Sequence, residues 1–276
     1  MSPKWFLMIA LCLGIFPGAG AQEETTKEEA VRLAVVITPE SSGLIGYLAE
    51  DFLVKTGYRL EVTSSSDVFQ LAHDGKADVV ISHYGKDGLE KFVLDGYGTW
   101  PKMVFSNQAV IIGPPGDPAK IKGLQNAALA MKQIAEAKAS FIVNSIAGMK
   151  YLEDILWQSA GNPAKGPWYH DPGIEKAEVV KLAEEEQGYF LWGAYPFLRY
   201  KDNHGAKLDI MVSSDPVLQR IMSAIIVNPN RIRSVNSEGA EVFLNYLLSP
   251  ATQASIAAFR TPGIEEQLWW PAGRDN

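Results

Sequence analysis

The feature that most constrains the fold is the alternation of strand-type and helix-type patterns along the chain. The apolar run LAVVIT (33–38) predicts a buried strand, and SGLIGYLAEDFLVKTG (42–57) has apolar residues at helical spacing before a stopping glycine. The same order returns in YRLEVTS (58–64) and DVFQLAHDG (67–75), followed by the buried-strand pattern ADVVISH (77–83). Patterns that alternate in this way predict an α/β fold.

The alternation continues beyond residue 83 without an internal repeat or a flexible linker. Further strands are predicted in the segments 103–118, 141–145, 189–198, 208–216 and 222–229, the first of them closed by a Pro/Gly turn. Further helices are predicted over 86–98, 124–139, 149–161, 173–188, 237–250 and 251–259.

The N-terminal segment predicts export. Lys4 provides a positive charge, residues 5–16 form an apolar run, and Ala19-Gly20-Ala21 is a small-x-small cleavage site. This is the order of a cleaved signal peptide spanning residues 1–21, and the apolar run is too short to cross a membrane. Leu11 before Cys12 disfavours a lipoprotein. We therefore expect a periplasmic protein that has no cysteine after cleavage.

Charge and motif content exclude several classes of function. The net charge of −7 disfavours nucleic acids and anionic membranes as partners. No metal signature, GxSxG or Walker-type loop occurs, so neither an enzyme nor a cofactor is predicted. The histidines are scattered: His73, His83, His170 and His204. An exported, acidic α/β chain of this size commonly folds into two lobes that are joined by crossing strands and close on a solute.

Two hydroxyl-rich segments each follow a predicted strand and precede a predicted helix. The first contains Thr38, Ser41 and Ser42, and the second runs from Thr63 to Ser66. Either segment alone is explained by helix capping. Two of them in consecutive strand–helix units also fit a shared crevice at the carboxyl ends of the strands, where an anion can be held.

His83 ends the next predicted strand, where it faces a loop. A lone histidine at such a position is compatible with a structural role or with a place in the cleft.

The sequence resembles the periplasmic tungstate-binding proteins of ABC transporters (TupA type). The likeness lies in SSGLIGYLAEDFLVKTGYRLEV, HDGKADVVISHYGKDGLEKFVLDGYG, FSNQAVIIGPPGDPAKIKG, EDILWQSAGNPAKGPWY, IIVNPNR and FLNYLLSPATQASIAAF, in order across residues 33–259. The resemblance implies a type II periplasmic binding protein. Lobe one would comprise 30–108 plus 223–276, and lobe two 109–222, with crossover strands that include 109–113 and 223–227.

The departures from that family fall where the ligand is expected. The family's Ser-Arg-Gly-Asp segment has no counterpart for its arginine at Val143 or Asn144. Met149 replaces a threonine and Lys150 a histidine, although Lys150 could act as a point charge. The expected ligand-binding residues are therefore a reduced set of hydroxyls with a more apolar wall: Thr38, Ser41, Ser42, Ser65, His83, Asn144, Ser145 and Trp192.

The resulting function is the solute-binding subunit of an ABC importer, a monomer whose membrane partner is the permease. The ligand implied by the resemblance is an oxyanion such as tungstate or molybdate. Two alternatives remain open: the same fold could bind a less charged small molecule, or serve a membrane receptor as a sensory binding protein.

Overall fold

The computed structural model describes residues 30–273, so the signal-peptide prediction for residues 1–21 lies outside the described part of the chain. Helices and strands alternate through it, which confirms the α/β prediction. Within residues 30–273, no helix is long and apolar enough to cross a membrane.

The first lobe is built on a sheet with the strand order β10-β4-β9-β3-β1-β2. Its strands are β1 (Ala30–Val35), β2 (Arg59–Ser64), β3 (Val79–His83), β4 (Lys102–Gly113), β9 (Gln219–Ile226) and β10 (Trp270–Pro271). β1 is parallel to β2 and β3, whereas β9 is antiparallel to β3 and β4. Its helices are α1 (Ile37–Ser41), α2 (Leu44–Thr56), α3 (Val68–His73), α4 (Leu89–Leu94), α9 (Ser237–Leu248) and α10 (Pro250–Ala258).

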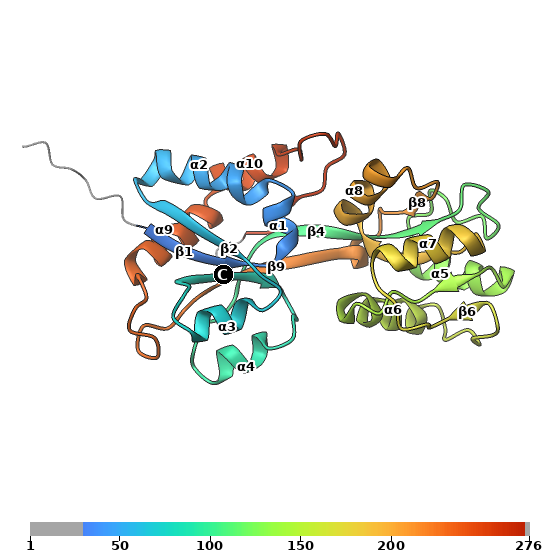
Figure 1. Cartoon of the computed structure of the whole chain (residues 1–276), viewed down its shortest axis with the longest axis horizontal. Coiled ribbons are helices and arrows are strands. Elements are labelled where there is room, and N and C mark those ends of the chain that lie inside the picture. Colours follow the sequence, from blue (N-terminus) through green and yellow to red (C-terminus); the bar gives the residue numbers. More distant parts are fainter. Residues whose placement is uncertain (1–29, 274–276) are drawn as a thin grey trace, which may run out of the picture.

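The second lobe is built around the far end of β4. There β4 pairs with β7 (Phe190–Gly193) and β8 (Asp209–Val212), and β5 (Phe141–Ile142) pairs with β6 (Tyr169–His170). The helical elements are α5 (Ala127–Ala137), α6 (Ala147–Ser159), α7 (Ala177–Glu186), α8 (Ala194–His204) and the 3-10 helix η1 (Pro216–Leu218). Figure 1 shows β4 and β9 running between the two lobes.

Two sequence predictions of secondary structure are wrong in part. The segment 189–198 is not one strand, because β7 ends at Gly193 and α8 begins at once. Pro196 lies in the first turn of α8, where its missing N–H costs no hydrogen bond. Strand β1 ends at Val35 rather than running to Thr38, and the short helix α1 takes up the next residues.

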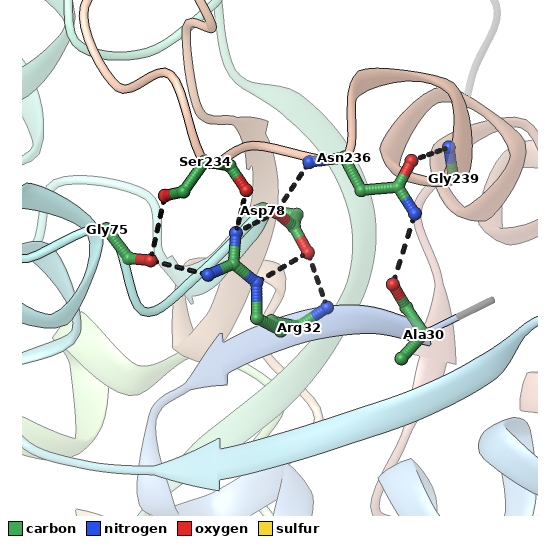
Figure 2. Close-up of polar contacts among 7 residues, drawn as sticks. All are labelled: Ala30, Arg32, Gly75, Asp78, Ser234, Asn236 and Gly239. Atoms are coloured by element: carbon green, nitrogen blue, oxygen red, sulfur yellow. Dashed lines mark hydrogen bonds and ion pairs between the residues drawn. The ribbon is translucent and has the colours of Figure 1, made fainter.

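A polar cluster, drawn in Figure 2, fastens the segment before α9 to the first lobe. Arg32 in β1 forms an ion pair with Asp78, and its guanidinium also donates to the carbonyl oxygens of Gly75 and Ser234. The fully buried Asp78 accepts a further hydrogen bond of 2.8 Å from the backbone N–H of Asn236. Because Asn236 caps α9, the cluster anchors the chain as it returns from the second lobe.

Candidate functional site

The carboxyl ends of β1, β2 and β3 meet at one edge of the first lobe. The backbone N–H of Ser65, just after β2, donates to the carbonyl of Val35 at 3.0 Å. The N–H of Val36 donates to the carbonyl of Ile81, two residues before His83, at 3.1 Å. Both hydroxyl-rich segments and His83 therefore leave the sheet side by side, as expected for parallel strands.

Neither hydroxyl-rich segment caps the helix that follows it. The N-cap residue of α2 is Gly43, which has a φ of 85° and no side chain to form a capping hydrogen bond. The N-cap residue of α3 is Asp67, whose side chain accepts from the N–H of Gln70. Ser41 lies at the end of α1, where its hydroxyl makes a long contact of 3.4 Å to the carbonyl of Thr38. The hydroxyl of Ser65 accepts from the N–H of Asp67 at 3.0 Å. The hydroxyls of Thr38, Ser41 and Ser65 thus remain able to bond to a ligand.

Ser42 has a structural partner instead. Its side chain is buried, and its hydroxyl donates to the carbonyl of Pro39 at 3.1 Å. The same hydroxyl accepts from the indole N–H of Trp269, also at 3.1 Å. Ser42 therefore joins the start of α2 to the C-terminal segment, beneath the surface that Thr38 and Ser41 form.

His83 lies among polar groups of the two crossover strands. It is opposite Met222 on β9, and its side chain is beside those of Asn107 and Arg220. Burial first, and then the positive charges of Arg220 and Lys86, lower the pKa of His83 to about 4, against an interaction with Asn107 that raises it. The imidazole is therefore neutral at neutral pH, when it presents one donor and one acceptor.

Asn144 and Ser145 lie in the second lobe, in the loop between β5 and α6. The Asn144 side chain is buried and bonded at both ends, donating to the carbonyl of Leu191 at 3.1 Å and accepting from the N–H of Lys176 at 3.4 Å. The hydroxyl oxygen of Ser145 is buried without a hydrogen-bond partner in residues 30–273. Asn144 thus holds the loop in place, and Ser145 has an unused hydroxyl.

Trp192 and Lys150, both in the second lobe, are less available to a ligand than the sequence predicted. Trp192 is buried, with its ring centroid 6.4 Å from that of Tyr200 on α8, so it packs inside the lobe. Lys150 is exposed and forms an ion pair of 2.9 Å with Asp171, which raises the lysine's pKa. Its charge is thereby compensated, which weakens the idea that Lys150 serves as a point charge for a ligand.

Two side chains absent from the sequence-based set form hydrogen bonds to elements that are distant in the sequence. Tyr195, in the first turn of α8, donates its hydroxyl proton to the carbonyl of Ser41. Arg220, on β9, donates to the carbonyl of Gly148 in the first turn of α6 at 3.0 Å. The signal of Arg220 in the sequence is a charge just before the strand predicted at 222–229.

A hollow beside α4 and the distribution of possible metal ligands were compared with the predicted ligand-binding residues. A hollow of about 470 Å³ beside α4, lined by Tyr84, Leu94 and Trp100 among others, contains none of the eight expected residues. No group of three His, Cys, Asp or Glu side chains in residues 30–273 is arranged to hold a metal ion.

Comparison with known proteins gives a consistent family. A family model described as bacterial extracellular solute-binding protein matches residues 33–259. The tungstate-binding protein TupA of Peptoclostridium acidaminophilum is 33% identical over 257 residues, which cover 91% of this chain and 89% of that protein.

Two solved structures of similar proteins have the same fold as this chain. The tungstate-binding protein TupA of Desulfovibrio alaskensis G20 superposes with a TM-score of 0.79 at 29% identity, covering 89% of this chain and 100% of that one. The structure described as the tungstate ABC transporter from Geobacter sulfurreducens gives a TM-score of 0.69 at 30% identity, covering 84% and 99%. The two-lobed arrangement of the chain is thus shared with these proteins.

Proposed function

Because this chain belongs to the bacterial extracellular solute-binding proteins, we propose that it captures an oxyanion of the tungstate type in the periplasm and delivers it to an ABC importer. The observation that carries the proposal is 33% identity to a tungstate-binding protein over nearly the whole chain. Its relatives are binding proteins, and capture of an oxyanion involves no catalytic step. The protein would act as a monomer, with the transporter's permease as its membrane partner.

We place the ligand between two lobes that comprise 30–108 plus 223–276 and 109–222. The pairing of β4 supports this division, since β4 leaves β9 for β7 at Ala109. Thr38, Ser41 and Ser65 would donate from the first lobe, and Ser145 from the second. Ser42, Asn144 and Trp192 would support the walls. Hydroxyls rotate to donate to an oxyanion, so these four suit a tetrahedral ligand.

One observation favours a second candidate, a less charged solute. Val143 is 1% exposed and Met149 is 8% exposed, so the positions where the family resemblance implies an arginine and a threonine are apolar and buried. A doubly charged anion needs charge-assisted donors to offset its desolvation. A small organic molecule with less charge would need fewer charge-assisted donors. A receptor-linked sensory role would leave the binding site unchanged and alter only the membrane partner.

Thermal melts of the protein from Gln22 onward test the oxyanion. A ligand at 100 times its dissociation constant stabilises the folded state by about 2.7 kcal/mol. For a chain of this size that raises the midpoint by about 5–10 °C. Tungstate and molybdate at millimolar concentration should give this shift, with sulfate and phosphate as comparisons. An unmoved midpoint with both metal oxyanions would refute the oxyanion proposal and direct the search to organic solutes.

A double substitution locates the site. Thr38→Ala with Ser65→Ala removes two donors from the first lobe and should abolish most of the tungstate shift. Ser159→Ala with Ser255→Ala is the matched control, because both hydroxyls are exposed and bond to their own helices. A shift that persists in the first double variant would place the anion elsewhere.

A further inference from the structure

Resting on the proposed function, we propose that Arg220 supplies the positive charge that holds the oxyanion, at the junction of β9 with the first turn of α6. The site would combine the Arg220 guanidinium with the side chains of Asn107 and Ser145. It would lie on the crossover strands rather than on the hydroxyl-rich loops alone, and it would include His83 as a neutral neighbour.

Strand register brings these groups to one face of the sheet. Arg220 lies directly opposite Asn107 across the β4–β9 pair. Met222, two residues further along β9, lies opposite His83 across the β3–β9 pair. Residues opposite one another in a ladder share a face, and so do residues two apart in a strand. Asn107, Arg220 and His83 therefore point to the same side, as their interactions with His83 also indicate.

Within residues 30–273, no carboxylate pairs with the charge of Arg220. Its guanidinium is half-buried. The other described arginines either pair with carboxylates or are exposed: Arg32, Arg59, Arg199, Arg231, Arg233 and Arg260. Burial lowers the pKa of Arg220, yet an arginine stays charged at neutral pH. A partly desolvated cation without an anion is costly unless a ligand provides one.

Polar atoms without partners mark the place where that ligand would bind. Asn107 is 8% exposed, and its Oδ1 has no hydrogen-bond partner within the described residues. The buried hydroxyl oxygen of Ser145, two residues before α6, likewise has none. Buried polar groups are nearly always hydrogen-bonded. Asn107 lies opposite Arg220, and Ser145 is three residues before Gly148, the hydrogen-bond partner of Arg220, so these two unpaired atoms point to a missing polar group. Rotation of the Asn107 amide would present its NH2 group to an anion.

The geometry suits a tetrahedral oxyanion with more than one charge. Arg220 uses Nη1 for its bond to the Gly148 carbonyl, which leaves further N–H donors in a planar fork. Gly148 makes room for that fork, since a Cβ there would lie 2.7 Å from Nη2. The N-terminal end of the 13-residue helix α6 adds a favourable dipole for negative charge. An acidic solute of a different shape would use the same charge but fewer of these donors.

Titration calorimetry with sodium tungstate and sodium molybdate tests the assignment on the protein from Gln22 onward. Arg220→Gln keeps hydrogen-bonding capacity without the charge and should weaken binding by about 10- to 100-fold. Arg220→Lys keeps the charge but loses the fork, and should fall between. Arg199→Gln is the matched control, because that arginine contacts Asp202 at 3.8 Å on α8; its affinity should stay within about twofold of the parent.

The ligand-free protein gives an independent readout. Since the charge of Arg220 is uncompensated, Arg220→Gln should melt at the same temperature as the parent or higher, whereas a merely structural arginine would lower the midpoint. Parent-like tungstate affinity in Arg220→Gln would overturn this inference and leave the proposed function standing. A parent protein that binds neither oxyanion would overturn the proposed function, and the inference with it. If Arg220→Gln does not fold, the inference is wrong unless Arg220→Lys folds and binds more weakly than the parent.

Discussion

His83 occupies a position where carrying a proton is unfavourable. Its pKa falls from an ordinary value of 6.5 to about 4 in the folded protein, through burial first and the charges of Arg220 and Lys86, against an interaction with Asn107 that raises it. The unfolded chain therefore binds a proton that the folded chain does not between these two values. The contribution of His83 to stability is complete above pH 6.5 and is lost as the pH falls to about 4, by about 3 kcal/mol.

Urea unfolding between pH 4 and pH 7 checks this prediction without added ligand. His83→Gln cannot titrate, so its free energy of unfolding should decline less steeply with acidity than that of the parent. His204→Gln is the control, because His204 is exposed and stacks on Tyr200. Equal slopes for the parent and His83→Gln would show that His83 titrates normally in the folded state.

Residue type alone does not distinguish hydroxyls that are bonded within the protein from those that are free to bind a ligand. Ser41 and Ser42 are neighbours of the same type, yet Ser42 is buried against Trp269, a residue 227 positions away, while Ser41 is exposed. The sequence predicted that both lie at the edge of the sheet, because the strand pattern ends there. It could not predict which hydroxyl bonds to the indole, since that depends on where the C-terminal segment packs.

At the scale of elements, β4 is one of the two strands that both lobes share, the other being β9. Its last residue, Gly113, lies against the ring of Tyr189, and a Cβ there would be 2.3 Å from Tyr189 Cδ1. Tyr189 is fully buried, and its hydroxyl donates to Asp117 at 2.7 Å. Gly113→Ala should therefore displace the ring and lower the free energy of unfolding by about 2–3 kcal/mol.

Chemical denaturation of Gly113→Ala measures this loss. Gly116→Ala, three residues on, is the matched control, because a Cβ there would meet nothing within 4 Å and its φ needs no glycine. The control should stay within about 0.5 kcal/mol of the parent. Equal stability of the two variants would mean that Tyr189 moves aside without cost.

Element boundaries were predictable where a local signal marks them. Helix α2 ends at Thr56, before Gly57 with its φ of 77°, as its glycine stop predicted. The boundary between β7 and α8 is marked by Gly193 and by Pro196 in the first turn of the helix, but the aromatic and apolar run from 189 to 198 continues through it, so one strand was predicted there. Pairing of Trp192 with Val110 on β4 fixes where the strand lies, and that contact is long-range.

At the scale of the whole molecule, one hydrogen bond links α8 to the first lobe away from the crossover strands. Tyr195→Phe removes the donor to the Ser41 carbonyl and should favour separation of the lobes. Since a net hydrogen bond contributes about 0.5–1.5 kcal/mol, tungstate affinity should fall about 2- to 10-fold. Small-angle scattering of the variant without ligand should give a larger radius of gyration, and saturating tungstate should restore compaction.

Tyr200→Phe is the control for this experiment, because the ring of Tyr200 packs on His204 in the same helix and phenylalanine keeps that contact. Its scattering and affinity should match those of the parent. If Tyr195→Phe also matches the parent in both measurements, the contact with Ser41 has no part in lobe closure.

The sequence by itself determined the α/β class, nearly all the elements, and the family, because these follow from local periodicity, turn residues and collinear motifs. It also placed Thr38, Ser65 and His83 at one edge, since strands that run parallel end together. Only the tertiary structure decided which groups remain unpaired there. Asn144 and Ser42 are bonded within the protein, whereas Arg220 lies opposite Asn107 and pairs with no carboxylate in the described part of the chain. Such pairing depends on the register of strands more than 100 residues apart, and no local pattern encodes it.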